Sequence, residues 1–341
     1  MKPFTFIPKR VYFEPGALEY PLGQELHSYF TSKNIPLLST TSHNRVTGIP
    51  GSTPAEGYRE AKNTLVVGVR KSKDFQTCKP SAHYQLPLAT SCPGKCEYCY
   101  LQTTLGKKPY LRVYVNIEEI LEKASLYMED RKPQITYFEG SATSDPVPVE
   151  PYTHSMAKTV EFFGSQEFGR LRFVTKFTDI DSLLNIKHEN HTHFRFSLNL
   201  PGYIEKFEHS TPQLEQRLEA VAKLLQAGYP TGLMIAPIFL EQGWERDYGN
   251  LLNTIKKAIP ASDGLTFELI THRFTSRAKN NILDIYPGTQ LPMEESSRTF
   301  KFGQFGYGKY VYPKELMDKA RQFFKDTIGD LFPETKIEYF V

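Results

Sequence analysis

Three cysteines lie close together in the stretch SCPGKCEYCY, residues 91–100. Cys92, Cys96 and Cys99 have the spacing C-x3-C-x2-C, and the whole chain holds four cysteines. A structural zinc ion takes four ligands, usually from two close pairs of side chains. Three thiolates from a single loop instead suit an iron–sulfur cluster that leaves one iron open, where a substrate or a cofactor can bind.

The fourth cysteine keeps a second interpretation open. Cys78 precedes the cluster of three and could complete a closed zinc site with them. In that case the four thiolates would stabilise the fold and take no part in a reaction.

The composition is that of an ordinary globular protein. The chain has 341 residues, of which 40% are hydrophobic and 23% are charged, and its net charge is only +3. No apolar run approaches the roughly 20 residues of a membrane-spanning helix, and the N-terminus lacks the apolar region of a signal peptide. We therefore expect a cytoplasmic protein without membrane contact, whose thiols are reduced and available for metal chemistry.

Strand-like and helix-like segments alternate through most of the chain. Apolar, β-branched runs predict strands at 64–69, 134–140, 170–177, 192–200, 232–240 and 265–274. Amphipathic patterns predict helices at 117–130, 152–164, 211–228 and 245–259. Thr211 and Pro212 are expected to begin the third helix, and Gly228 to end it. Such alternation is typical of βα units around a parallel sheet, and its length suits a partial (β/α)6 barrel.

Three regions are expected within this α/β fold. Residues 1–85 read as a small N-terminal α/β lobe, residues 86–280 as the partial barrel, and residues 281–341 as a C-terminal extension. The extension holds a Gly-rich aromatic stretch, 300–313, that predicts a β-hairpin, followed by a helix and a short strand. The cysteines follow the strand-like run LPLATSC, and active groups of βα barrels lie in such loops.

The cysteine motif resembles the signature of the radical S-adenosylmethionine (SAM) superfamily, C-x3-C-x-aromatic-C, with Tyr98 as the aromatic residue. The resemblance extends along nearly the whole chain. The segments that carry it include LEYPLGQEL (18–26), NTLVVGVRK (63–71), CEYCYLQTTLGKKPYLRVYVN (96–116), LRFVTKF (171–177), AGYPTG (227–232), GKYVY (308–312) and KIEYF (336–340). In these segments the chain is similar to the spore photoproduct lyase family.

The resemblance implies a DNA-repair reaction. That family reverts 5-thyminyl-5,6-dihydrothymine, the ultraviolet lesion of spore DNA, to two thymines. Its reduced cluster cleaves SAM to give a 5′-deoxyadenosyl radical, which takes a hydrogen atom from the lesion. After the bridge between the thymines breaks, a cysteine returns a hydrogen atom to the product, and tyrosines relay the radical so that SAM is re-formed.

The resemblance also assigns residues. Cys92, Cys96 and Cys99 match the ligands of the 4Fe–4S cluster, and Tyr98 and Tyr100 match the relay tyrosines. The implied SAM contacts are Ser144, Lys176, Ser197, Asn199 and Ala236.

Each assignment has a plainer alternative. Lys176 is placed to pair with the SAM carboxylate, but a half-buried lysine at a strand end would look the same. Tyr98 and Tyr100 could simply pack around the cluster and shield it from water.

The sequence departs from the family at the hydrogen-donor cysteine. The family pattern FEA-x-CTSD reads FEGSATSD here, residues 138–145, so that Ala142 occupies the donor position. An alanine cannot give up a hydrogen atom in the way that a thiol can. Cys78 lies in FQTCKPSAHY, where the family usually has a serine, and we expect it to act as the donor from another wall of the site. The alternative is an unreactive, partly buried thiol.

The hairpin departs from the family as well. The family pattern KWGRYGIGKY reads KFGQFGYGKY here, residues 301–310. Gln304 replaces an arginine and Phe305 replaces a tyrosine, so we expect a wedge that still stacks but holds DNA phosphates less strongly. The remaining candidate DNA contacts are Lys301, Lys309 and Arg273.

Three functional hypotheses follow. The first is a radical SAM lyase that acts on double-stranded DNA carrying the thymine lesion, as a monomer, with electrons from a ferredoxin or a flavodoxin, in the cytoplasm or in the spore core of a sporulating host. The second is a divergent paralogue with the same chemistry on another nucleic acid or small molecule. The third is a DNA-binding protein without enzymatic activity, with a structural zinc ion or a sensing cluster.

Overall fold

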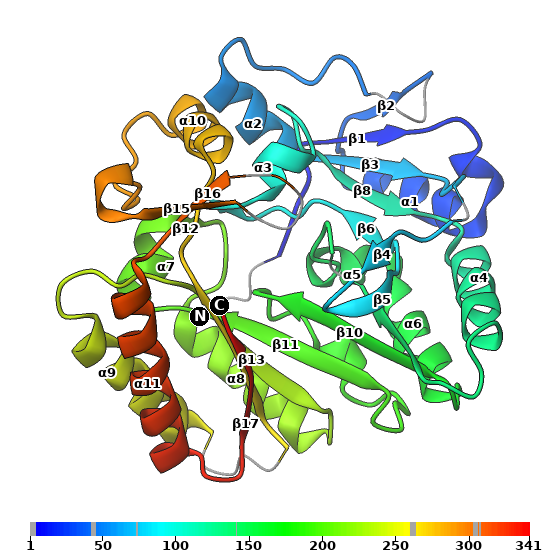
Figure 1. Ribbon diagram of the computed structural model, residues 1–341. Coiled ribbons are helices and arrows are strands. Elements are labelled where there is room, and N and C mark those ends of the chain that lie inside the picture. The colour runs from blue at the N-terminus through cyan, green and yellow to red at the C-terminus, as the bar shows by residue number, and fades with distance from the viewer. Residues whose placement is uncertain are drawn as a thin grey trace.

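The computed structural model describes residues 5–41, 46–72, 74–140, 142–259, 264–302, 306 and 308–341. Its strands form two main sheets, one of five strands and one of eight, and most helices pack outside them (Figure 1). The mixed α/β fold expected from the alternation of strands and helices is confirmed.

The smaller sheet lies in the N-terminal part of the molecule. Its strand order is β2-β1-β3-β8-β6, and the pairs are parallel except for β6 with β8. All five residues of β3 are buried, as expected of an interior strand that is covered on both faces. The strands are β1 (Arg10–Phe13), β2 (Leu37–Ser39), β3 (Thr64–Gly68), β6 (Ala89–Thr90) and β8 (Leu111–Tyr114), and the helices beside them are α1 (Pro21–Ser32) and α2 (Pro54–Lys62).

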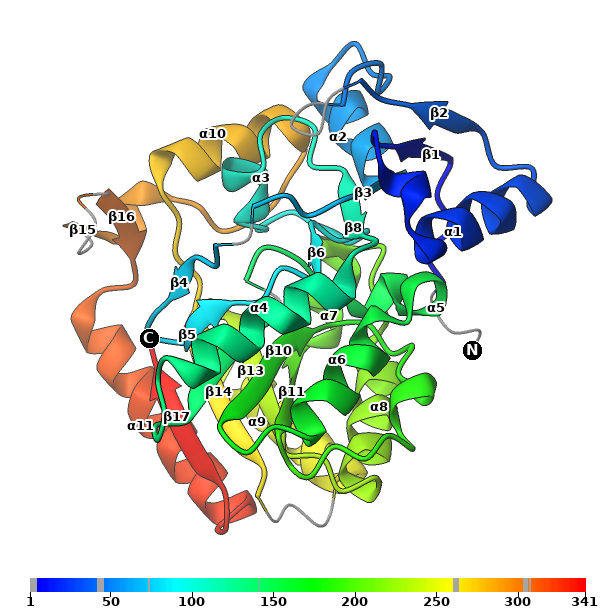
Figure 2. The same cartoon turned by 90° about the vertical axis from the view of Figure 1, so that its right-hand side faces the viewer.

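The larger sheet curls into an open barrel, seen from two sides in Figures 1 and 2. Its order is β17-β14-β13-β11-β10-β9-β5-β4, and every pair except β4 with β5 is parallel. The carboxyl ends of the parallel strands therefore meet at one rim. The strands are β4 (Thr77–Cys78), β5 (Ala82–Gln85), β9 (Thr136–Glu139), β10 (Gly169–Thr175), β11 (Thr192–Leu198), β13 (Thr231–Ile238), β14 (Thr266–Thr271) and β17 (Lys336–Phe340).

The helices cover the outside of this barrel (Figure 2). In α9, for example, Trp244, Tyr248, Leu251 and Ile255 are buried, at the spacing of a single helix face. The main covering helices are α4 (Ile117–Glu129), α5 (Glu150–Thr153), α6 (Ser155–Gly164), α8 (Leu214–Gln226), α9 (Trp244–Ala258) and α11 (Lys314–Leu331).

Short elements complete the rim of the barrel. They are β7 (Lys95–Cys96) paired with β12 (Glu208–His209), the hairpin of β15 (Thr299–Phe302) and β16 (Gly308–Val311), and the helices α3 (Leu101–Thr104), α7 (Pro201–Phe207) and α10 (Ser276–Ile285). The two strands of the expected hairpin are thus present. Of its turn, the structure describes only Gly306, which has a φ of 76° and so a conformation that favours glycine.

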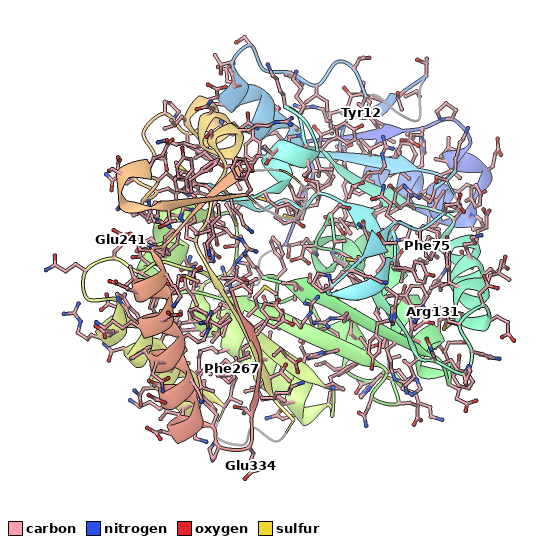
Figure 3. The ribbon with its side chains drawn as sticks, viewed as in Figure 1. Tyr12, Phe75, Arg131, Glu241, Phe267 and Glu334 are labelled. Atoms are coloured by element: carbon pink, nitrogen blue, oxygen red, sulfur yellow. The ribbon has the colours of Figure 1, made fainter. Side chains whose placement is uncertain are left out.

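The core follows the two sheets. The largest buried cluster fills the space between the large sheet and its helices, and it includes Phe75 and Phe267, both labelled in Figure 3. A second cluster lies under the small sheet and includes Phe30, Leu65 and Val67. Among the helices of the described residues, none is long and apolar enough to cross a lipid bilayer.

The start of α8 differs from the prediction. The helix begins at Leu214 and is capped by Gln213, whereas Thr211 and Pro212 lie in the loop before it. Both residues instead contact the buried guanidinium of Arg217, the threonine through its hydroxyl and the proline through its carbonyl. The expected glycine at the end is present, since Gly228 has a φ of 82° just beyond the helix.

The three-part division at residues 85 and 280 stays a prediction. The bound at residue 85 does not separate the two sheets. Before it, β4 and β5 belong to the large sheet, and after it, β6 and β8 belong to the small sheet.

Candidate functional site

The three clustered cysteines lie in one loop at the rim of the barrel. Cys96 is buried on β7 and pairs with Glu208 of β12, while the residues Cys92 and Cys99 are partly exposed. The backbone N–H of Cys99 donates to the carbonyl of Cys96 at 3.2 Å, which turns the loop back on itself. The loop is therefore fixed on one side and open on the other.

The three thiols also act on one another electrostatically. Burial raises the pKa of Cys92 to about 11, and the positive charge of Lys62 opposes this rise while Cys99 adds to it. Burial likewise raises the pKa of Cys96, with further increases from Glu208, Cys99 and Cys92. Thiols this close need a shared positive centre to become thiolates together, and an iron–sulfur cluster meets that need.

The fourth cysteine lies on a different element from the other three. Cys78 lies on β4, where the charges that act on its thiol are those of Glu139, Arg195 and Arg172.

A set of buried and half-buried polar groups borders the cysteine loop, and we call it the cofactor wall: Lys176, Ser197, Asn199, Glu208 and Tyr98. Lys176 follows β10, and its Nζ donates to Ser197 Oγ at 2.6 Å and pairs with Glu208 Oε1 at 3.2 Å. The Tyr98 hydroxyl donates to the same Glu208 oxygen, and the Lys176 ammonium lies 5.7 Å from the centre of the Tyr98 ring.

Glu208 is the centre of this wall. Its second oxygen accepts from Arg217 Nη2 at 2.6 Å, and both side chains are fully buried. Burial opposes ionisation of Glu208, but the charges of Arg217 and Lys176 outweigh it and lower the pKa of the carboxyl. A carboxylate is thus held ionised inside the protein, with one cation on each side of it.

The remaining residues with expected SAM contacts lie at the ends of neighbouring strands. Asn199 Nδ2 donates to the carbonyl of Pro237 at 2.9 Å, directly after Ala236. Ser144 forms a bridge with Ser91, next to the first cysteine. All five residues with expected SAM contacts therefore lie on the same rim as the cysteine loop: Lys176, Ser197, Asn199, Ala236 and Ser144.

Asp145 and the pair of Glu208 with Arg217 were not singled out from the sequence. Asp145 is buried, and its carboxylate accepts from the Thr175 hydroxyl at 2.9 Å and from the backbone N–H of Lys176 at 3.1 Å. Burial raises its pKa to about 7 in spite of these bonds. The Asp in the TSD motif was a signal that could have been followed, whereas nothing in the local sequence marks Glu208 or Arg217.

A second group of residues, which we call the donor wall after its predicted role, comprises Cys78, Tyr100 and Ala142. The Tyr100 hydroxyl donates to the backbone carbonyl of Ala142. The Tyr100 residue is 59% exposed, yet partial burial of its hydroxyl raises its pKa, and negative charge at the Cys99 and Cys78 thiols raises it further. Tyr100 thus lies within electrostatic reach of both a cluster cysteine and the fourth cysteine.

The Cys78 thiol is half-buried and protonated at neutral pH. Burial raises its pKa to about 11, and Glu139 adds to the rise while Arg195 and Arg172 reduce it. These charges belong to a buried network in the barrel, in which Arg172 pairs with Glu268 at 2.7 Å and Arg195 pairs with both Glu139 and Glu268.

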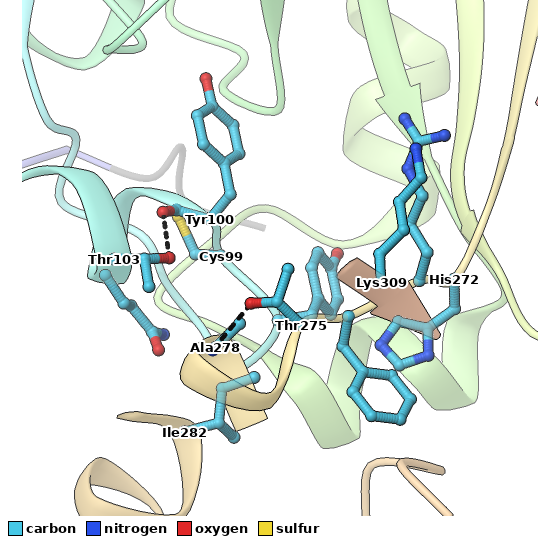
Figure 4. A pocket seen from close by; sticks show the side chains of 12 residues that line it. Cys99, Tyr100, Thr103, His272, Thr275, Ala278, Ile282 and Lys309 are labelled. Atoms are coloured by element: carbon cyan, nitrogen blue, oxygen red, sulfur yellow. Dashed lines mark hydrogen bonds between the residues drawn. The ribbon is translucent and has the colours of Figure 1, made fainter. Parts of the chain in front are cut away.

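A cavity of about 210 Å³ opens beside the cysteine loop (Figure 4). Cys99 and Tyr100 line one side of it, and His272 and Lys309 line the other. Arg273 also lines it, so two of the candidate DNA contacts lie next to the cysteines. Within the described residues, Nδ1 of the buried His272 has no hydrogen-bond partner, and burial lowers the pKa of this ring to about 3, so the ring is neutral.

The other candidate DNA contacts belong to the hairpin. Lys301 lies on exposed β15 and is paired with Lys309 of β16. Burial lowers the pKa of Lys309, and the charges of Arg273 and Lys301 lower it further, so these three cations lie near one another. Gln304 and Phe305 lie outside the described residues.

A second cavity, of about 190 Å³, lies beside Ala142. Gly140, Ala142 and Ser144 line it on one side, and Leu86 and Tyr114 are among the residues on the other. Two of these residues, Gly140 and Ala142, are positions at which the sequence departs from the family pattern.

Comparisons with known proteins agree along the whole chain. The family model described as spore photoproduct lyase matches residues 6–341. Spore photoproduct lyases of Clostridium acetobutylicum and Bacillus subtilis are each 49% identical to the chain, over 98% of both sequences.

Solved structures are equally similar. A spore photoproduct lyase complexed with the dinucleoside spore photoproduct matches with a TM-score of 0.95 and 49% identity over all of both chains. A second match, also with a TM-score of 0.95, is a double mutant with bound SAM (AdoMet) and the dinucleoside lesion, in which one cysteine is replaced by alanine and one serine by cysteine.

Proposed function

The chain belongs to the spore photoproduct lyase family, and we propose that it repairs the spore photoproduct with Cys78, and not residue 142, as its hydrogen donor. It is a radical SAM lyase whose cofactors are SAM and a 4Fe–4S cluster. No observation favours a different substrate or a role without catalysis.

One observation carries the proposal. Three thiols on a single loop lie at the barrel rim beside Lys176 and Ser197, in a chain that matches the family over 6–341. Fold alone does not assign a function, but this group of side chains belongs to the reaction that the family performs.

The residues of the cofactor wall are suited to hold SAM. The Lys176 ammonium can pair with the SAM carboxylate. Ser197 and Asn199 can form hydrogen bonds with the polar groups of SAM. Beside this wall, Ser144 offers a further hydrogen bond, and the small side chain of Ala236 leaves space at the strand end. Bound together, the cluster and SAM supply the radical that removes a hydrogen atom from the lesion. Glu208 holds Lys176 and the Tyr98 hydroxyl in place before SAM arrives.

Cys78 has the properties that a hydrogen-atom donor needs. Its thiol keeps its proton at neutral pH, because its pKa is raised to about 11, and a thiolate would have no hydrogen atom to give. Relative to the family pattern, the chain has alanine in place of the donor cysteine at 142 and cysteine in place of serine at 78. A solved relative with one Cys-to-Ala and one Ser-to-Cys exchange has both SAM and the lesion bound, which supports the proposal.

The donor step balances within the chain. The S–H bond of Cys78 breaks, a C–H bond forms on the product radical, and a thiyl radical remains on Cys78. The Tyr100 O–H bond then breaks to restore the S–H bond, which leaves a tyrosyl radical on Tyr100. The Tyr98 hydroxyl would return a hydrogen atom to Tyr100, and the resulting Tyr98 radical would regain its hydrogen atom from 5′-deoxyadenosine, so that the cycle can close.

The DNA side of the site is basic and aromatic. The cations suited to bind DNA phosphates are Lys301, Lys309 and Arg273. We expect the distorted duplex to be contacted by Phe305 and Gln304. The expected partners are double-stranded DNA with the lesion and a small electron-transfer protein such as a ferredoxin or a flavodoxin. We further expect a monomer that works in the cytoplasm, or in the spore core where the host forms spores.

The test is a repair assay without oxygen. The cluster is reconstituted, SAM, dithionite and a dinucleotide spore photoproduct are added, and the products are resolved by chromatography with mass detection. We expect restored thymidylyl-thymidine as the main product. Formation of 5′-deoxyadenosine with an untouched dinucleotide would reject the proposed substrate.

A further inference from the structure

A buried lysine of the N-terminal region reaches the cysteine loop. Lys62 is the last residue of α2, and its side chain is 1% exposed. Its Nζ donates to the backbone carbonyl of Cys92 at 2.9 Å and to Ser91 Oγ at 3.2 Å. It also lies 5.5 Å from the centre of the Tyr58 ring, which is itself fully buried.

The described partners of Lys62 are all neutral. They are a carbonyl, a hydroxyl and an aromatic ring, and none supplies the negative charge that a buried ammonium needs. Buried lysines are rare unless they are paired, because removing the charge from water is costly. The position of Lys62 therefore points to an anion that binds beside Cys92.

Lys62 also holds an unusual turn in the loop. Ser91 has a φ of 63°, which places a non-glycine residue in the left-handed region just before the first cysteine. Its hydroxyl accepts from Lys62 and donates to the carbonyl of Pro109 at 2.8 Å. Strained residues of this kind occur at functional sites, where the surrounding structure maintains them.

We propose that Lys62 is the buried counter-charge of the iron–sulfur cluster and sets how readily the cluster accepts an electron. The inference rests on the cluster site at Cys92, Cys96 and Cys99 proposed above. A cubane held by three thiolates is anionic and becomes more so when reduced, so a fixed cation next to a ligand favours the reduced form. The effect is strong at this position because burial keeps water from screening the charge.

The experiment measures the reduction potential of the reconstituted full-length protein. Lys62→Met keeps the length and apolar stem of the side chain but removes its charge. We expect the ratio of reduced to oxidised cluster at a fixed potential to fall about tenfold, which corresponds to a shift of about 59 mV to more negative potential. Redox titration followed by electron paramagnetic resonance gives this value, and iron and sulfide contents confirm that the cluster is loaded.

Two further variants separate charge from structure. Lys62→Arg keeps the charge and should keep the wild-type potential. Lys95→Met removes a neighbouring lysine that is only half-buried and bonded to Asn63 and Ser210, and it should shift the potential far less because water screens that charge.

The outcomes are distinct. A fully loaded Lys62→Met protein with an unchanged potential would overturn the inference. If the Lys62→Met protein does not bind a cluster, the Lys62→Arg protein decides between charge and structure. A loaded Lys62→Arg protein with the wild-type potential supports the role of the positive charge. A natively folded Lys62→Arg protein that binds no cluster rejects that role. Failure of the wild-type protein itself to bind a cluster would instead reject the proposed function.

Discussion

The cofactor wall and the donor wall face the same barrel rim but are built differently. On the cofactor wall, Glu208 and Arg217 are fully buried and Lys176 is bonded to two neighbours. On the donor wall, the side chains at 140 and 142 are minimal, and a cavity of about 190 Å³ lies beside them. The charges of the cofactor wall are paired with one another, whereas the donor wall presents small side chains beside a cavity.

The difference reflects what each wall must do. A cofactor with several charged groups needs several partners at fixed positions, so a change at one position disturbs the rest. A hydrogen-atom donor needs only one weak S–H bond within reach of the product. Under our proposal the donor has moved from position 142 to position 78, while the cofactor wall stays as it is.

The largest effect is expected from the cysteine loop, which both walls depend on. Cys96→Ser replaces the buried thiol on β7. We expect the iron content to fall and repair to drop to background, because an iron–sulfur cluster held by three thiolates has no spare ligand. Iron and sulfide analysis with the repair assay checks this. Retention of both would show that Cys96 is not a ligand.

A large change in stability is expected within the cofactor wall. Glu208→Gln keeps the shape of the side chain but leaves Arg217 and Lys176 buried without their carboxylate. We expect the free energy of unfolding in urea to fall by about 3–5 kcal/mol. In the control variant Glu219→Gln, which breaks a surface pair with Lys223, the fall should be less than about 1 kcal/mol. Equal small changes in both would mean that the buried network contributes little.

The donor wall should respond in its products and not in its stability. For Cys78→Ser we expect the yield of repaired dinucleotide to fall by an order of magnitude and dithionite adducts of thymine to appear, since the product radical then lacks a donor. In D2O the wild-type product should carry one deuterium from the exchanged thiol.

The matched control is the double variant Cys78→Ser with Ala142→Cys, which returns the thiol to the position of the family pattern. It should regain clean repair. Clean, deuterium-labelled product from Cys78→Ser alone would show that Cys78 is not the donor.

The two walls were also unequally predictable from the sequence. The strands and most helices follow from hydrophobic periodicity, and the cysteine loop follows from the spacing C-x3-C-x2-C. The expected SAM contacts at the rim were assigned by resemblance to the family. The pair of Glu208 with Arg217 followed from neither, because it forms only when β12 is pinned to β7 and the loop before α8 wraps around the guanidinium. The same contact explains why Thr211 and Pro212 are not helix caps. Lys62 was missed because α2 and the cysteine loop meet only in the folded chain.

The smallest effect is expected with pH. The pKa of Cys78 is raised to about 11, so its thiol keeps the hydrogen atom at every pH well below that value. The ratio of repaired product to adduct should stay level up to about pH 9, whereas an unperturbed thiol would lose its hydrogen atom around pH ~8.5. Product analysis across this range checks it, and a decline centred near pH ~8.5 would show that burial does not protect the thiol.

The exchange of strands between the two sheets has a consequence for how the chain folds. After β1, β2 and β3 have joined the small sheet, the chain passes to the large sheet for β4 and β5, returns for β6 and β8, and then leaves again for β9. Neither sheet can be completed from a continuous piece of chain. The two should therefore melt in one cooperative transition, and cutting the chain between them would leave two incomplete sheets instead of two separable domains.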